Sequence, residues 1–197
     1  MSDQESLKSE IERLEERLMD GRRELEQLRA RLPPAPVGEF ELQGPDGAVA
    51  LRDAFEGRDE LLVVHNMGSG CAYCTLWADG LNGILPHLQD RAAFLVVSPD
   101  SPQAQRAFAE SRGWNFRMLS DPRGAFTRAM GFLRNEGAEE NPWPGVSGFW
   151  RTAGGDVVRT GSSPFGPGDL FCPAWHLFGL LKNGSEQWQP KTRYAAR

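Results

Sequence analysis

Two cysteines, Cys71 and Cys74, follow a short run of aliphatic residues at 61–64, and this order is the strongest constraint on the fold. A continuous apolar run of that length is typical of a strand buried on both faces of a sheet. After the cysteines, apolar residues recur at helical spacing between 77 and 88, and a second apolar run follows at 94–97. A strand, a helix and a strand in that order predict a crossover unit. We therefore expect the cysteines at the start of a helix.

The region from 38 to 182 continues this alternation. The sequence Gly-Pro-Asp-Gly at 44–47 predicts a turn between two short strands, with a helical turn after them. Ser101 can cap a helix that has Pro102 at its first position and Gly113 past its end. The pattern predicts an α/β fold in which helices flank a central mixed sheet with an N-terminal β-hairpin. The remaining elements are expected as a strand at 116–119, a helix from Pro122, strands near 146–150 and 156–159, and a final helix at 173–182.

The first 32 residues carry a different pattern, in which apolar residues recur at alternating steps of four and three. They are Leu7, Ile11, Leu14, Leu18, Leu25, Leu28 and Leu32, with Gly21 in the one missing slot. This heptad seam predicts a long coiled-coil helix over 1–32. Three prolines within 33–37 predict a stiff linker after it, ahead of an α/β domain at 38–182 and a tail at 183–197. A single amphipathic helix folded onto its own domain remains an alternative.

The charges beside the seam favour one arrangement of a helix pair. A parallel in-register dimer would place Glu10 against Glu15 and Arg17 against Arg22. In an antiparallel pair, opposite charges meet instead. We therefore predict a homodimer through residues 7–32, with its two helices antiparallel and one α/β domain at each end.

Composition limits the function classes. Hydrophobic residues make up 40% of the 197 residues and charged residues 25%, as in globular proteins. The net charge of −5 includes no basic excess, so we expect no nucleic-acid partner. We expect no membrane partner either, because no apolar run reaches the ~20 residues that a span needs. The acidic start lacks signal-peptide features, so we expect a cytoplasmic protein in which the three cysteines are reduced or catalytic.

The order of strand, short loop, CxxC and helix, followed by βα and ββα units, resembles the thioredoxin fold. The stretches "FELQGPDGAVALRDAFEGR" and "MLSDPRGAFTRAMGF" resemble segments of peroxiredoxins and related thiol-disulfide proteins. More narrowly, "CxxCxxWADGxNGxxPHL" and "PGVSGFWR" resemble an uncharacterised bacterial thioredoxin-like family, domain of unknown function 899. The resemblance covers about residues 38–182. It implies a thioredoxin-like fold and thiol–disulfide oxidoreductase chemistry on a disulfide-containing protein or small molecule.

The chemistry requires two thiols that can meet. Two intervening residues in the first turn of a helix bring the sulfurs together, and the helix N-terminus favours a thiolate on the first cysteine. Cys71 is therefore the expected attacking thiolate and Cys74 the resolving thiol. Two free buried thiols are the alternative, since cysteine often serves as a small apolar residue.

His65 marks a departure from thioredoxins, which have a buried acidic residue six positions before the first cysteine. We expect His65 to take the proton from Cys74 near neutral pH without a large pKa shift. A structural histidine hydrogen-bonded inside the sheet is the alternative. Thioredoxins also place a cis-proline before the strand that faces CxxC. Here Pro144 lies two residues before Val146 and does not occupy that slot. The resemblance therefore does not extend to the backbone feature with which thioredoxins bind a peptide disulfide.

Two other functions stay open. Our main prediction includes no cofactor. In the alternative, Cys71 and Cys74, with His65 or His87, bind Cu(I) or zinc. In copper chaperones with a thioredoxin-like fold the histidine comes much later in the chain than His65 or His87, and His176, beside Cys172, is the only late candidate here. The third alternative is a non-enzymatic oligomeric binding module. Cys172 itself is expected to be a packed thiol outside the catalytic cycle.

Overall fold

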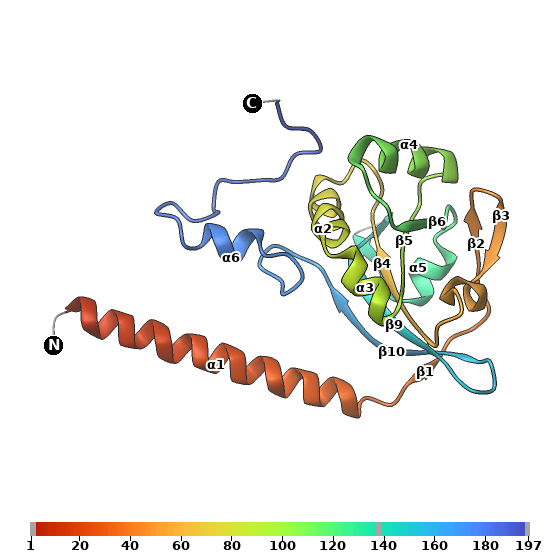
Figure 1. Cartoon of the computed structure of the whole chain (residues 1–197). Helices are drawn as coiled ribbons and strands as arrows, with labels where there is room; N and C mark the ends of the chain where they lie inside the picture. Colours follow the sequence, from red (N-terminus) through yellow and green to blue (C-terminus); the bar gives the residue numbers. More distant parts are fainter. Residues whose placement is uncertain (1–2, 137–138, 196–197) are drawn as a thin grey trace. The chain divides into compact units, whose positions relative to one another are not determined.

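Figure 1 shows the computed structural model of the chain, which describes residues 3–136 and 139–195. The chain divides into two compact units, Met1–Pro34 and Ala35–Arg197. The predicted segments 1–32 and 183–197 each include two residues outside the described ones, and their boundaries stay predictions. Among the described residues, no helix combines the length and apolar character that a bilayer span requires.

The first unit contains one helix, α1 (Asp3–Arg31), which confirms the predicted long N-terminal helix. Its first turn carries Asp3 and Glu5, and its last turn carries Arg29 and Arg31. This distribution places negative charge at the positive end of the helix dipole and positive charge at its negative end. The local sequence therefore supports a helix that continues without interruption until the prolines.

The second unit is built on a mixed sheet of eight strands in the order β1-β10-β9-β4-β5-β6-β2-β3. The strands β4, β5 and β6 are parallel, and β9 pairs with β4 in the antiparallel direction. This sheet confirms the predicted fold class, including its N-terminal β-hairpin. The strands are β1 (Ala35–Pro36), β2 (Glu41–Gly44), β3 (Gly47–Ala50), β4 (Glu60–His65), β5 (Ala93–Ser98), β6 (Arg117–Ser120), β9 (Gly145–Arg151) and β10 (Val157–Pro164).

Helices cover both faces of the sheet (Figure 1). Two apolar cores are buried between the helices and the sheet. Because side chains alternate along a strand, Leu61 and Val63 of β4 join one core while Val64 joins the other. The first core contains residues of η1 and α5, and the second contains residues of α2 and α3, with α4 packed against it. The helical elements are η1 (Leu51–Phe55), α2 (Ala72–Gly83), α3 (Leu85–Arg91), α4 (Pro102–Arg112), α5 (Ala125–Ala129) and α6 (Ala174–Phe178).

Local turn and capping signals are confirmed where their chemistry is specific. The strands β2 and β3 pair from Glu41–Ala50 inward to Gly44–Gly47, at the predicted Pro-Asp turn. The Ser101 hydroxyl accepts a hydrogen bond from the Ala104 N–H at 3.2 Å, and Gly113 adopts a φ of 67° past the end of α4. The two ends of α4 are therefore set by the capping residues from which they were predicted.

Three sequence-based expectations are wrong in extent. The helix expected from the cysteines to residue 88 breaks at Ile84, because Pro86 has no N–H to continue the ladder. The final helix, expected over 173–182, ends at Phe178, and the helix expected from Pro122 begins at Ala125. A two-stranded sheet, β7 (Leu133–Glu136) with β8 (Glu139–Pro142), was not predicted.

Candidate redox site

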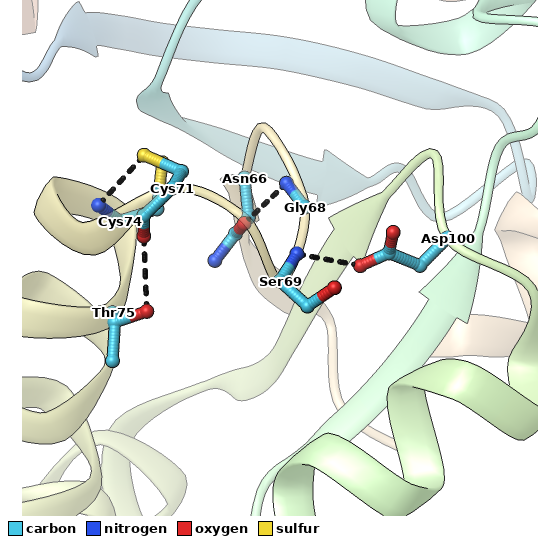
Figure 2. The surroundings of a disulfide bond; sticks show 7 residues. All are labelled: Asn66, Gly68, Ser69, Cys71, Cys74, Thr75 and Asp100. Carbon is cyan, nitrogen blue, oxygen red and sulfur yellow. Dashed lines mark hydrogen bonds between the residues drawn. A yellow bond between two sulfur atoms is a disulfide. The ribbon is translucent and has the colours of Figure 1, made fainter. Parts of the chain in front are cut away.

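The two cysteines lie where β4 delivers the chain to α2. The strand ends at His65, a loop spans 66–70, and Cys71 is the residue that caps the N-terminus of α2. Cys71 and Cys74 are joined by a disulfide, with their Cα atoms 5.2 Å apart (Figure 2). The prediction that both cysteines lie at the start of a helix is therefore confirmed.

The two sulfurs differ in their surroundings. The Cys71 Sγ accepts a hydrogen bond from the Cys74 N–H at 3.0 Å, and Thr75 Oγ1 donates to the Cys71 carbonyl at 2.9 Å (Figure 2). Cys71 is partly exposed, whereas Cys74 is only 3% exposed. A backbone N–H directed at a sulfur at a helix N-terminus stabilises the thiolate. The two cysteines therefore differ: Cys71 is the more exposed residue and its sulfur accepts the backbone N–H at the helix N-terminus, whereas Cys74 is buried.

The loop before Cys71 is held by two side chains that the sequence analysis did not single out. Asn66 Oδ1 accepts from the Gly68 N–H at 2.8 Å, and Asp100 Oδ2 accepts from the Ser69 N–H at 2.7 Å (Figure 2). Gly68 adopts a φ of 106°, and the Cys71 N–H donates to its carbonyl at 3.1 Å. The sequence does contain features that could have identified these two residues. Glycines mark the loop, and Asn66 and Asp100 are polar residues that follow two buried strands.

His65 lies in a different environment from the expected one. Its side chain is 1% exposed, and its Nε2 is hydrogen-bonded to Ser147 Oγ at 2.9 Å. Its ring stacks on Phe132 and Phe126, which belong to the core on the face of the sheet opposite α2. Burial, reinforced by the positive charge of Arg159, lowers the pKa of His65 to about 3. The expectation of titration near neutral pH is therefore wrong, and the hydrogen-bonded alternative describes this residue.

The residues considered as metal ligands are dispersed. His87 is exposed on α3, and the Nε2 atom of His176 is hydrogen-bonded to the Asp169 carbonyl at 2.8 Å. Within residues 3–136 and 139–195, no group of three or more His, Cys, Asp or Glu side chains is arranged to hold a metal ion. The copper or zinc alternative stays a prediction, and its ligand set would need to be completed from elsewhere.

The C-terminal segment packs against the second core beside α2. Tyr73, which lies between the two cysteines, stacks on Trp175 with ring centroids 6.1 Å apart. The rings of Trp77 and Phe165 stack with their centroids 5.3 Å apart, and Cys172 is buried in the same core. Burial raises the pKa of the Cys172 thiol. A buried thiol with a raised pKa is a poor nucleophile, in agreement with the packed role expected for it.

Comparisons with known proteins identify the family and the fold. The family model described as "Bacterial protein of unknown function (DUF899)" matches residues 3–196. The comparison with curated proteins finds no match. Solved structures with a similar fold include peroxiredoxin Q of Xanthomonas campestris, which is 18% identical, with a TM-score of 0.55 over 64% of this chain and 79% of that chain.

Two further structures extend this likeness. Reduced Prx3 of Vibrio vulnificus, in complex with hydrogen peroxide, is 16% identical, with a TM-score of 0.57 over 71% of this chain and 88% of that chain. A putative thioredoxin reductase of Burkholderia cenocepacia is 17% identical, with a TM-score of 0.53 over 68% and 88% of the two chains. At these identities the likeness concerns the fold. The chain therefore belongs to the DUF899 family of bacterial proteins and has a thioredoxin-like fold similar to that of the peroxiredoxins.

Proposed function

We propose that this protein is a thiol–disulfide oxidoreductase in which Cys71 and Cys74 alternate between a dithiol and a disulfide. The observation that carries the proposal is the position of Cys71 at the N-terminus of α2, with its sulfur accepting the Cys74 N–H. The disulfide between the two residues supports reversible oxidation of this pair. The fold shared with peroxiredoxins supports the same chemistry by analogy.

The reaction proceeds in two exchanges. The Cys71 thiolate attacks one sulfur of a substrate disulfide, the substrate S–S bond breaks, and the first thiolate leaves and takes up a proton from water. Cys74 then loses its proton to solvent and attacks the Cys71 sulfur. This step releases the second substrate thiolate and forms the Cys71–Cys74 disulfide. Two electrons pass from the pair to the substrate, and an external dithiol restores the reduced protein.

Burial of Cys74 orders these steps. Because Cys71 is partly exposed and Cys74 is buried, a substrate disulfide meets Cys71 first. His65 is not assigned the proton of Cys74, because its ring faces the opposite core and its pKa is about 3. The Cys74 proton is therefore expected to leave through water at the Cys71 side of the helix.

Small disulfides are the first substrates to test. No cis peptide bond occurs among the described residues, so Pro144, which directly precedes β9, is a trans proline. The backbone feature with which thioredoxins present a peptide is thus missing. Hydrogen peroxide, which is bound in the Prx3 structure, is the second probe. With peroxide, Cys71 would be oxidised to a sulfenic acid with release of water, and Cys74 would resolve it to the disulfide with release of a second water.

Single-turnover reaction with a chromogenic aromatic disulfide tests the proposal. The reduced wild-type pair should release two thiol equivalents and end as the Cys71–Cys74 disulfide. Cys74→Ser should release one equivalent and retain the other as a mixed disulfide on Cys71. Cys71→Ser should lose the rapid phase. Slow, equal reaction in all three proteins at neutral pH would contradict the oxidoreductase and favour the binding module.

A further inference from the structure

We infer that α1 is a dimerisation element whose partner is the α1 of a second copy of this chain, running antiparallel to it. None of the 29 described residues of α1 is buried. The six seam side chains within the helix are between 37% and 66% exposed: Leu7, Ile11, Leu14, Leu18, Leu25 and Leu28. A continuous row of exposed aliphatic side chains on a long helix marks a surface that associates with a partner.

The width of this row indicates what kind of partner it fits. A helix that packs on a globular domain needs an apolar stripe of about 100° or more. In α1 both flanking columns are charged at every position, so the apolar row is only two residues wide in each heptad. That narrow seam matches another helix rather than a sheet or a broad core. One column is Lys8, Glu15, Arg22 and Arg29, and the other is Asp3, Glu10, Arg17, Glu24 and Arg31.

The two charged columns specify the direction of the partner helix. In a parallel in-register pair, Glu10 would oppose Glu15 and Arg17 would oppose Arg22. Only two contacts would be attractive, Asp3–Lys8 and Glu24–Arg29. Two-fold symmetry doubles every contact equally. The two repulsive kinds of contact therefore offset the two attractive kinds, and the charges give a parallel pair no net stabilisation.

An antiparallel pair centred between Met19 and Asp20 reverses that balance. Its apolar layers join Leu7 to Leu32, Ile11 to Leu28, Leu14 to Leu25, and Leu18 to Gly21. Its flanks then place opposite charges together in Glu10–Arg31, Arg17–Glu24 and Glu15–Arg22. The single unfavourable contact is Lys8 against Arg29. Charge complementarity of the chain with itself therefore selects a second antiparallel copy as the occupant.

A charge reversal at Glu15 separates the two directions, because its effect has opposite signs in them. In the antiparallel pair, Glu15→Arg sets two arginines against each other; in the parallel pair it replaces the Glu10–Glu15 repulsion with an attraction. Glu16→Arg is the matched control. It changes the charge by the same amount, but Glu16 lies one residue further along, on the face of the helix away from the seam. Arg22→Glu added to Glu15→Arg restores the antiparallel contact with its signs exchanged.

Sedimentation of the full chain under reducing conditions, over a hundred-fold range of micromolar concentration, measures these effects. We expect a monomer–dimer equilibrium for the wild type. Glu15→Arg should raise the dimer Kd by roughly three- to thirty-fold, Glu16→Arg should leave it within about two-fold, and the double variant should recover the wild-type value. Added salt should reduce the effect of Glu15→Arg.

Three results would overturn the inference. A wild type that stays monomeric throughout would mean that α1 packs elsewhere, on its own domain or on another protein. Tighter association of Glu15→Arg would identify a parallel pair. Equal effects of Glu15→Arg and Glu16→Arg would show that net charge, and not the seam, governs association. The release of two thiol equivalents by Cys71 and Cys74 should be unchanged in every one of these variants. The experiments can therefore refute the dimer proposal without refuting the oxidoreductase proposal, and the reverse.

Discussion

The imidazole of His65 lies almost parallel to the ring of Phe132, with ring centroids 4.1 Å apart and 18° between the planes. Phe126 stacks on the same imidazole at 5.5 Å, and Ser147 supplies its hydrogen bond within the sheet. The Nδ1 atom of His65 has no hydrogen-bond partner among the described residues. Aromatic rings enclose the imidazole and exclude water, so a protonated, charged His65 would lack the solvation that it has in water. His65 therefore stays neutral in the folded protein.

This burial predicts how stability depends on pH. The unfolded chain takes up a proton at His65 near pH 6.5, and the folded chain does so only at about pH 3. Between these values the unfolded state binds more protons, so His65 lowers the free energy of unfolding as the pH falls, by about 1.4 kcal/mol per pH unit at most. His65→Gln, which cannot titrate, should become relatively more stable than the wild type by roughly 2 kcal/mol between pH 7.5 and pH 5. Urea unfolding at both pH values measures the difference. Parallel pH curves for the two proteins would show that His65 titrates normally.

Gly145 is expected to tolerate no side chain. A Cβ at this position would meet the Ser163 carbonyl oxygen at 2.6 Å and the Phe132 Cζ at 2.8 Å. The carbonyl belongs to β10, which is paired with β9 across Gly145, so it cannot move without loss of the ladder. Gly145→Ala should lower the free energy of unfolding by about 1–3 kcal/mol or more. Gly161→Ala is the control, because a Cβ at Gly161 meets nothing within 4 Å. Similar unfolding curves for the two variants would contradict the packing described.

Gly68 is expected to matter for the redox rate. Its φ of 106° is unfavourable for other residues, and a Cβ there would lie 3.1 Å from the Asp100 Oδ1 atom. Because Asp100 holds the Ser69 N–H and the Gly68 carbonyl holds the Cys71 N–H, Gly68→Ala should displace Cys71. We expect a several-fold slower release of the first thiol equivalent. Gly70→Ala, in the same loop but with no neighbour within 4 Å of its Cβ, should react at nearly the wild-type rate. The idea fails if the two alanine variants react equally fast.

Cys172 should be unreactive in the folded protein. It is buried in the second core, and burial raises its thiol pKa. A thiol-specific alkylating reagent should therefore modify Cys172 only after denaturation. Cys172→Ser should retain the full release of two thiol equivalents. Loss of turnover in a folded Cys172→Ser protein would instead assign this thiol to the catalytic cycle.

Elements with strong local signals could be predicted from the sequence. The helix α4 has its cap at Ser101, its proline at 102 and its left-handed glycine at 113, and each of these residues acts over a few positions only. The order of apolar runs gave the crossover through Cys71 in the same manner. The break at Ile84 was also predictable, because Pro86 cannot extend a preceding helix.

The surroundings of the site depend on contacts between distant residues, which local patterns do not contain. His65 meets Ser147 across 82 positions, and Asp100 reaches Ser69 across 31. The faces of β4 could be counted by alternation, but which aromatic rings cover His65 depends on how Phe126 of α5 and Phe132, just before β7, pack against β4. The final helix ended early because Gly179 weakens helix propagation, while the aromatic contacts of Trp175 hold the segment in place without it.

Mass-spectrometric mapping of the thiols is the most direct test of the redox pair. Cleavage after arginine and lysine leaves both Cys71 and Cys74 in the peptide 59–91, and Cys172 in 160–182. After mild oxidation, denaturation and alkylation, we predict that 59–91 carries no alkyl group and is two hydrogen masses lighter than the free dithiol, while 160–182 carries one. After treatment with a dithiol before alkylation, 59–91 should carry two groups. Alkylation of both Cys71 and Cys74 in the oxidised sample would contradict a reversible disulfide between them.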